Sequence, residues 1–283
     1  MTSPPAQLPH LCVSVVLYHS ELVRLDETLG TLVAAVQAAR RSGLLGAVTL
    51  AVVDNSVCGD YHGALQQHLE RQPWGEAGID CELLEMPVNA GYGAGHNEAF
   101  GRHAADLHLV LNPDVAMAAD VLQQGLEYLR DHPQVVLVCP RGEAGDGSPA
   151  YLSKRLPTVL VLILRAFAPA SLQRLFADRL ASYEMHDLHA ACVPAPVPLA
   201  SGCFMLVRGA ALRAAGGFDE RYFLYFEDFD LSLRLAAQGA VEYLPGMRVR
   251  HYGGGSAAKG WRHRWWFLRS GVRFFSDHGW RWF

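Results

Sequence analysis

The segment CELLEMPVNAGYGAGHNEAFGRHAADLHLVLNPD, residues 81–114, decides the fold that this chain is expected to adopt. It opens with the apolar stretch Cys81–Met86, which has the length of a strand and ends before a proline. A glycine-rich turn then leads into Asn97–Ala104, which has the pattern of a helix, and Leu107–Leu111 is a second apolar strand. Strand, helix and strand in this order predict a β-α-β unit with parallel strands.

The same alternation precedes this segment. Leu11–Leu17 predicts a strand and Leu22–Ala39 a helix, and Val48–Val53 and Tyr61–Leu69 repeat the pair. Each strand is almost wholly apolar, as a parallel sheet with helices on both faces requires. The expected fold class is therefore α/β, with a Rossmann-like, doubly wound and mostly parallel sheet that begins at about residue 10 and extends to about residue 116.

The part from about residue 117 to 257 is less regular and predicts a second half of the molecule. Residues 151–198 show helical pieces without a clear pattern, and a helical segment rich in tryptophan, phenylalanine and arginine follows at 258–283. The other elements expected here are strands at Gln134–Pro140, Leu199–Val207 and Val241–Leu244, and helices at Gly209–Ala215 and Phe229–Ala237.

Composition narrows the class of protein. A net charge of -4 offers no broad positive field, so a nucleic-acid partner is not expected. The six cysteines are scattered without a C-x-x-C pair, which favours a reducing, cytoplasmic location. Met1–His10 lacks the pattern of a secretory signal, and the longest apolar run, Val159–Leu164, is far shorter than the roughly 20 residues of a membrane-spanning helix.

Polar residues follow four successive strands, at Tyr18-His19, Asp54-Asn55, Asn89–Gly95 and Asp114. Since ligands bind where the carboxyl ends of such strands meet, these clusters predict one site. A glycine-rich turn at a helix N-terminus can cradle a diphosphate, although such turns also occur without a ligand. Asp114 suits a hard cation such as Mg²⁺, and the alternative is that it caps the following helix.

The run GGFDERYFLYFEDFD, residues 216–230, sets acids among aromatic residues just before an expected helix. Such acids can simply complement the helix dipole. A carboxylate among aromatic rings is also partly desolvated, which raises its pKa towards that of a general base, so Asp228 or Glu227 is the candidate base. His251 precedes a glycine-rich loop and is either a hydrogen-bonded structural residue or a second ligand of a metal at Asp114.

Together these motifs resemble the family-two inverting glycosyltransferases, which have the GT-A fold, and in particular their rhamnosyltransferase-like branch. Asn112 stands where the metal-binding D-x-D motif of the family has its first aspartate. The segments that carry the resemblance are Val15–His19, Val53–Ser56 (V-D-N-S), Asn89–Asn97, Leu111–Asp114 and Gly217–Asp230, the last being similar to the family's G-G-F-D-E…E-D-x-D block.

The resemblance implies one GT-A catalytic domain over residues 1–257, with a donor-nucleotide half at about 10–116 and an acceptor half at about 117–257. It implies Asp228, with Glu227 beside it, as the catalytic base, and Asp114 with His251 as ligands of Mg²⁺ or Mn²⁺. The residues that it implies for binding the donor are Tyr18, His19, Asp54, Asn55, Asn89, Gly91, Gly93, Asn97 and Asn112.

The implied activity is inverting transfer of L-rhamnose from dTDP-L-rhamnose to a hydroxyl of a saccharide or a lipid-linked glycan, in cell-surface polysaccharide synthesis. One alternative is a UDP-sugar transferase of the galactofuranose type. Another is a non-catalytic module that binds sugar nucleotides, against which Asp114, Asp228 and His251 argue together. A nicotinamide-dependent oxidoreductase needs a glycine fingerprint after the first strand, where Tyr18-His19-Ser20-Glu21 stands instead.

The aromatic and basic segment 258–283 has two compatible interpretations. Tryptophan and arginine together are typical of a helix that lies on an anionic membrane surface, here the inner face of the membrane. The other interpretation is a helix that packs back on the catalytic domain.

Overall fold

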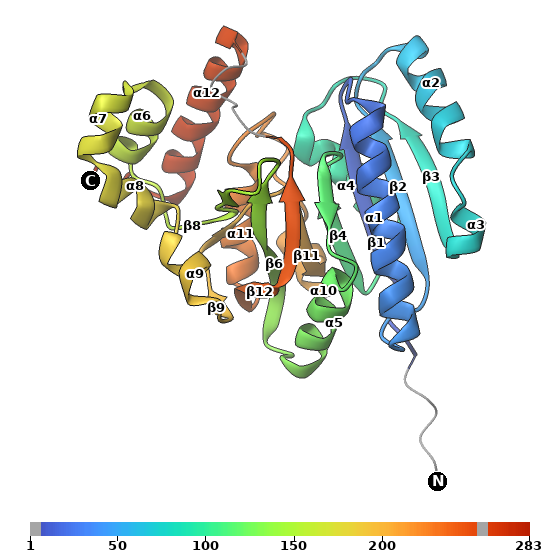
Figure 1. The fold of residues 1–283 in the computed structure, drawn as a ribbon. Coiled ribbons are helices and arrows are strands. Elements are labelled where there is room, and N and C mark those ends of the chain that lie inside the picture. Colours follow the sequence, from blue (N-terminus) through green and yellow to red (C-terminus); the bar gives the residue numbers. More distant parts are fainter. Residues whose placement is uncertain (1–6, 254–259) are drawn as a thin grey trace.

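The computed structural model describes residues 7–253 and 260–283 of the chain (Figure 1). The strands are β1 (Leu11–Leu17), β2 (Val48–Asp54), β3 (Ile79–Glu85), β4 (Leu107–Leu111), β5 (Val115–Met117), β6 (Val135–Ala144), β7 (Pro149–Ala150), β8 (Ser153–Lys154), β9 (Ala195–Pro196), β10 (Leu199–Ala200), β11 (Phe204–Arg208) and β12 (Ala240–His251). The helices are α1 (Leu22–Arg41), α2 (Gly59–Glu70), α3 (Trp74–Ala77), α4 (Tyr92–Arg102), α5 (Val121–Asp131), α6 (Val159–Phe167), α7 (Ala170–Leu175), α8 (Ala177–Tyr183), α9 (His186–Ala191), α10 (Gly209–Ala215), α11 (Glu227–Ala236) and α12 (Gly260–His278).

One large sheet runs through the molecule in the order β3-β2-β1-β4-β11-β6-β12-β5. The first four strands in this order are parallel to their neighbours. β11 is antiparallel to both β4 and β6, and β5 is antiparallel to β12, whereas β6 and β12 are parallel. The expected α/β class with a mostly parallel sheet is confirmed, and the same sheet carries both halves of the chain.

Helices cover both faces of this sheet. α1 and α5 lie on one face, and α4, α10 and α11 lie on the other (Figure 1). β1 is buried along its whole length because side chains from both faces are covered. Val13 and Val15 point into the α1 side, while Val16 and Ser14 point towards α4. There the Ser14 Oγ lies 2.7 Å from Nδ1 of His96, and burial lowers the pKa of His96 to about 3, so this imidazole is neutral.

Two expected strands differ from the prediction and one strand is additional, because long-range pairing overrides the local pattern. The predicted strand Leu199–Val207 is interrupted by a turn at 201–203, so that β10 pairs with β8 while β11 joins the large sheet. The strand predicted at Val241–Leu244 is 12 residues long, since its second half pairs with β5 and β6. β5 is an additional short strand directly after Asp114.

Two helices begin earlier than predicted. α4 begins at Tyr92 and not at Asn97, which places Gly93 and Gly95 inside the helix. Glycine disfavours a helix interior by about 1 kcal/mol relative to alanine, but a Cβ at Gly93 would lie only 2.8 Å from the Cβ of Phe218. Close packing therefore explains a helix that local propensity does not predict. α11 begins at Glu227, so the acidic residues form its first turn.

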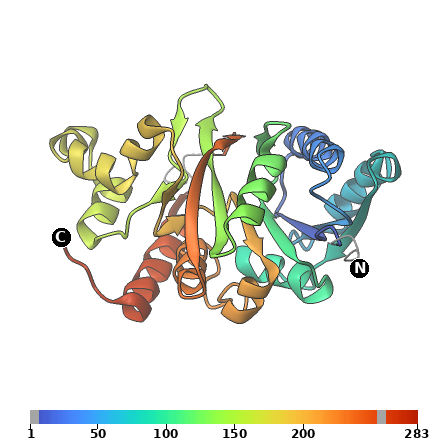
Figure 2. The same cartoon turned by 90° about the horizontal axis from the view of Figure 1, so that it is seen from below.

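α6 to α9 and α12 lie together at one end of the molecule, and α2 and β3 lie at the other end (Figure 1 and Figure 2). The chain after α12 returns to α6, where the Val159 N–H donates to the carbonyl of Arg281 over 2.8 Å. Phe274 and Phe275 of α12 are buried in an aromatic cluster with Phe226. Among the described residues, no helix combines the length and the apolar character needed to cross a membrane.

Candidate active site

The carboxyl ends of β1 to β3 open into a cavity of about 450 Å³. Tyr18 follows β1, Asn55 follows β2, and Asn89 and Gly91 lie between β3 and α4, and all four line this cavity. α12 lines the facing side, where the ring of Trp266 is part of the wall. The structure thus brings four of the nine expected donor-binding residues together, from three separate strand ends.

Gly91 holds a backbone geometry that only glycine adopts readily, with a φ of 98°. A Cβ at this position would collide with the carbonyl oxygen of Phe223. That oxygen accepts the Tyr92 N–H over 3.1 Å, and the Gly91 carbonyl accepts from Nδ2 of Asn55 over 2.8 Å. Gly91 therefore connects the end of β2 with the loop before α11, and it lines the 450 Å³ cavity.

Asp54 and His19 lie near this cavity without lining it. The Asp54 carboxylate is buried, accepting the Ser56 N–H over 2.8 Å and lying 3.1 Å from Nδ1 of His62. The Ser56 hydroxyl in turn accepts the N–H of His19 over 2.8 Å. In this arrangement Asp54 holds the turn after β2, and the ring of His19 is exposed beside Tyr18.

Asn97 and Gly93 connect α4 to the loop that precedes α11. The Asn97 side chain accepts the Phe218 N–H and donates to the Phe218 carbonyl, both over 2.8 Å. Gly93 lies under the side chain of the same phenylalanine. Neither residue lines the 450 Å³ cavity, and both have a packing role in the structure.

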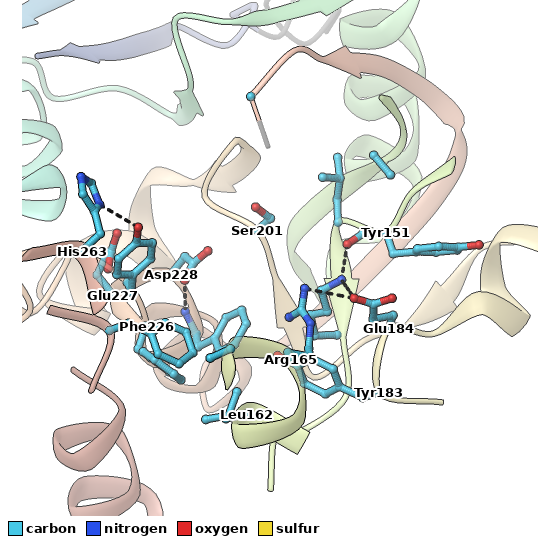
Figure 3. A pocket seen from close by; sticks show the side chains of 18 of the residues that line it. Tyr151, Leu162, Arg165, Tyr183, Glu184, Ser201, Phe226, Glu227, Asp228 and His263 are labelled. Carbon is cyan, nitrogen blue, oxygen red and sulfur yellow. Dashed lines mark hydrogen bonds and ion pairs between the residues drawn. The ribbon is translucent and has the colours of Figure 1, made fainter. Parts of the chain in front are cut away.

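A second cavity of about 580 Å³ lies between α11, α6, β8 and α12 (Figure 3). Asp228 and Glu227, from the first turn of α11, line one wall. The Asp228 carboxylate accepts the N–H of Gly202 through Oδ2 and the N–H of Phe229 through Oδ1, each over 2.9 Å. These two bonds fix the carboxylate in place.

Asp114 and His251 come together at the ends of β4 and β12. Oδ1 of Asp114 lies 3.4 Å from Nε2 of His251, and Nδ2 of Asn112 lies 3.5 Å from the same nitrogen. A Cβ at Gly253 would collide with the Asp114 carboxylate, so glycine permits the close approach. Since Asp114 precedes strand β5, the alternative that it caps a helix is wrong.

A continuous chain of polar contacts joins these two groups through Tyr92. The Tyr92 hydroxyl lies 2.9 Å from Oδ1 of Asn112 and 2.6 Å from the carbonyl oxygen of Gly202. Gly202 donates its own N–H to Asp228, and Asn112 contacts His251. Asp228 and His251 both line the 580 Å³ cavity, so the candidate base and the candidate metal site share one space.

Comparisons of sequence with known proteins find similar rhamnosyltransferases in two organisms. No family model matches the chain. The N-acetylglucosaminyl-diphospho-decaprenol L-rhamnosyltransferase of Mycobacterium tuberculosis is 28% identical over 221 residues, which are 72% of this chain and 66% of that protein. Rhamnosyltransferase WbbL of Escherichia coli is 27% identical over 172 residues, 57% of this chain and 61% of that protein.

Solved structures agree on the fold. GalNAc-T7 in complex with UDP, GalNAc and Mn²⁺ has a TM-score of 0.63 at 13% identity, over 96% of this chain and 48% of that one. The mannosyltransferase PcManGT of Pyrobaculum calidifontis, in complex with GDP-Man and Mn²⁺, has a TM-score of 0.61 at 17% identity, over 98% of this chain and 66% of that one. The chain has the GT-A fold, and its sequence is similar to those of rhamnosyltransferases. The matched part spans less than two thirds of the length of either rhamnosyltransferase relative.

In this GT-A chain the two acids of α11 differ in their surroundings. Burial, and then the charge of Asp228, raise the pKa of Glu227 well above its ordinary value, and Oε2 of Glu227 has no hydrogen-bond partner among the described residues. Burial also raises the pKa of Asp228, but the N–H groups of Gly202 and Phe229 and the charge of Lys154 work against that rise. When two neighbouring carboxyls compete to ionise, hydrogen bonds to the charged form favour the one that accepts them, and here that is Asp228.

Asp114 and His251 fit a divalent cation at the carboxyl end of the GT-A sheet. The Oδ1 atom of Asp114 is buried without a hydrogen-bond partner among the described residues, and it faces an imidazole nitrogen 3.4 Å away. Mg²⁺ ligands at 2.0–2.1 Å in octahedral geometry are about 3 Å apart, so a modest adjustment would let both atoms bind one ion. No group of three or more acidic, histidine or cysteine ligands occurs within residues 7–253 and 260–283.

Sequence reasoning missed several residues that line the larger cavity or connect its parts. Tyr92 lies inside the recognised glycine-rich motif, yet its hydroxyl, which links two strand ends, gives no local signal. Lys154, Arg165 and Glu184 line the 580 Å³ cavity from the segment between residues 151 and 198, where the pattern was least regular.

Proposed function

We propose that this chain is an inverting glycosyltransferase that moves L-rhamnose from dTDP-L-rhamnose to a hydroxyl of a saccharide or lipid-linked glycan, in the synthesis of a cell-surface polysaccharide. The observation that carries the proposal is the shared cavity of Asp228 and His251, with the polar chain through Tyr92 between them. Both sequence relatives are named as rhamnosyltransferases, which supports the choice of sugar.

The proposed reaction is a single displacement. The acceptor hydroxyl oxygen attacks the anomeric carbon from the face opposite the nucleoside diphosphate, which leaves as the new glycosidic bond forms, and the configuration inverts. Asp228 accepts the proton of that hydroxyl. Two backbone N–H groups fix its orientation and favour its charged form, while burial raises the pKa of the neighbouring Glu227 well above its ordinary value.

The donor nucleotide is proposed to occupy the 450 Å³ cavity, in the half of the domain at about residues 10–116. Tyr18 and Asn55 offer a ring and an amide to the base and sugar of the nucleotide. Asp114 and His251 would hold Mg²⁺ or Mn²⁺, which supplies charge to stabilise the departing diphosphate. The GT-A structures in complex with Mn²⁺ and a nucleotide or nucleotide-sugar support both components. The acceptor is proposed to enter the 580 Å³ cavity, in the half at about 117–257.

A peripheral contact with the cytoplasmic face of an anionic membrane is also proposed. Residues 260–283 hold five arginines and one aspartate, whereas the whole chain has a net charge of -4. Aromatic and basic side chains on one surface are typical of helices that lie in the headgroup region. The exposed apolar side chains of this end include Phe167, Leu175, Trp261, Trp265, Trp282 and Phe283.

The test of the donor class is thermal unfolding of the purified chain with dTDP, UDP or GDP, each with and without Mn²⁺. A ligand at one hundred times its Kd stabilises the folded state by about 2.7 kcal/mol. We expect the largest increase in unfolding temperature with dTDP and Mn²⁺, and a loss of the metal-dependent part in Asp114→Ala. A larger increase with UDP would favour the galactofuranose-type alternative, and nucleotide binding without sugar transfer would favour the non-catalytic module.

A further inference from the structure

Two basic side chains, Lys154 and Arg165, line the 580 Å³ cavity, and Figure 3 shows Arg165 across the cavity from Asp228. Lys154 extends from β8 and Arg165 from α6. Nη2 of Arg165 lies 3.0 Å from Oε1 of Glu184, and Nζ of Lys154 lies 3.7 Å from the same oxygen. One carboxylate therefore pairs with two cations, so this wall has one more positive charge than this carboxylate balances.

The surroundings keep this charge in the cavity. The Lys154 side chain is 13% exposed, and its ammonium donates to the carbonyl of Tyr151 over 2.6 Å. The ring of Tyr183 lies beneath both cations, 5.4 Å from the guanidinium of Arg165. Burial lowers the pKa of Lys154 to about 8, so the amine is mostly protonated at neutral pH and gains from a nearby anion.

The charges of the whole cavity favour an anionic ligand. Its lining includes three basic side chains, with Arg264 of α12 as the third, and three acids. Burial, and then the charge of Asp228, raise the pKa of Glu227 well above its ordinary value, which disfavours a negative charge on this acid. Three basic side chains therefore share the cavity with two acids that carry a negative charge more readily, Asp228 and Glu184. Arg165, which shares Glu184 with Lys154, lies across the cavity from Asp228 (Figure 3).

The cavity also becomes apolar towards α6. Leu162 and Phe167 line it from the same helix as Arg165. Phe167 is 54% exposed and Ile163, one turn before, is 50% exposed, so the apolar lining continues onto the outer surface of α6. A ligand with a sugar at Asp228 and a charged group at Arg165 would find an apolar path beyond that group.

We propose that Lys154 and Arg165 form a binding subsite for the diphosphate of a sugar-diphosphate-lipid acceptor, whose sugar lies at Asp228 and whose lipid leaves the cavity past Phe167. This assignment rests on the proposed glycosyltransferase function. A planar guanidinium and an ammonium on one wall match the oxygens of two linked phosphates. The alternative is that the two cations only hold Glu184, and so connect α6 and β8 to the residue after α8.

The test compares two acceptors that differ in the diphosphate alone. One is N-acetylglucosamine linked through a diphosphate to a short alkyl chain, and the other is the alkyl glycoside of the same sugar. Their affinities for the full chain with dTDP and Mn²⁺ are measured by titration calorimetry. The preference for the diphosphate acceptor is expected to fall about 10- to 100-fold in Lys154→Met and in Arg165→Gln, as for loss of a charge-assisted hydrogen bond.

Glu184→Gln is the sharper test, because the proposal predicts that this variant changes the preference for the diphosphate acceptor in the opposite direction. Without the competing carboxylate both cations are available, and the preference for the diphosphate acceptor is expected to rise. A folding defect would not raise it. Arg155→Gln is the matched control, since Arg155 lies in the same segment but pairs with Asp187 and does not line the cavity. Its preference is expected to match that of the original chain.

The proposal is overturned if Lys154→Met and Arg165→Gln leave the preference unchanged, or if they weaken both acceptors equally. Transfer of rhamnose is measured in the same samples with dTDP-rhamnose. Transfer to both acceptors without any preference would contradict the proposed diphosphate subsite and still agree with the proposed function. Selective binding of the diphosphate acceptor with no sugar transfer would contradict the proposed function and still agree with the subsite.

Discussion

Among single residues, the neighbouring acids Glu227 and Asp228 make the most direct prediction. Asp228→Asn removes the proposed proton acceptor and should lower the rate of transfer by about 10²- to 10⁴-fold. Glu227→Gln replaces a carboxyl whose raised pKa favours the uncharged form, so its rate should stay within about tenfold of the original. Both rates are measured with saturating donor, and the thermal shift with dTDP serves as the control for an intact donor site. Equal losses in the two variants would contradict the assignment of the base.

The same pair predicts how stability depends on pH. The pKa of Glu227 is raised in the folded state, so the stabilisation from its protonated form is complete below the ordinary value of 4.5 and is lost as pH rises through the raised value. Glu227→Gln removes this loss. Its unfolding temperature relative to that of the original chain should therefore be higher at pH 8 than at pH 4. A difference that does not change with pH would show that Glu227 is ionised in the folded state.

Gly91 gives a prediction about backbone geometry. Alanine at a φ of 98° is strained, and its Cβ would collide with the carbonyl of Phe223, so Gly91→Ala should lower the free energy of unfolding by about 2 kcal/mol or more. Gly101→Ala is the matched control in α4, where a Cβ would meet no atom within 4 Å. It should be neutral or stabilising by up to about 1 kcal/mol. Urea unfolding measures both, and similar values for the two would be evidence against this role of Gly91.

At the scale of elements, α12 packs on the catalytic domain with one side and exposes tryptophan side chains on another. Phe274 and Phe275 anchor it in the aromatic cluster, and His278 pairs with Asp230 of α11 over 2.8 Å. Its other side keeps Trp261 and Trp265 exposed. The interpretation as a helix that packs on the catalytic domain is confirmed, and contact with a membrane stays a prediction.

That membrane prediction is tested with vesicles. The double variant Trp261→Ser and Trp265→Ser should bind vesicles that contain phosphatidylglycerol at least tenfold more weakly than the original chain, because it removes apolar area from the interface. Co-sedimentation measures the binding. Val23→Ser changes an exposed apolar residue of α1 instead and should have no effect. Equal binding by all three proteins would place the membrane contact elsewhere or exclude it.

At the scale of the whole molecule, one sheet joins the proposed donor and acceptor halves. β4, from the donor half, pairs with β11, and β11 pairs with β6. Neither half can lose its strands without exposing the edge of the other, so we expect one cooperative unfolding transition. Far-UV circular dichroism and tryptophan fluorescence should give the same midpoint in urea, since five of the six tryptophans lie at or after residue 261. Two separate midpoints would show that the halves unfold independently.

Much of this fold was predictable from local patterns. Apolar stretches such as Leu11–Leu17 and Val48–Val53 are strands because both faces are buried, and the helices between them follow from their periodicity. Pairing across the sheet was not predictable, because the antiparallel position of β11 depends on contacts with residues about 65 to 100 positions away. For the same reason, the turn that divides Leu199–Val207 has no strong local signal.

The sequence by itself determined which residue types stand at the strand ends and which acids lie among aromatic rings, since both depend on near neighbours in the chain. Tertiary structure alone decided how those groups act together. It placed Tyr92 between Asn112 and Gly202, gave Glu227 and Asp228 different surroundings, and brought Lys154 and Arg165 into the cavity that Asp228 lines. Distances between groups and the burial of each carboxyl are set by packing between distant segments, and no local pattern contains them.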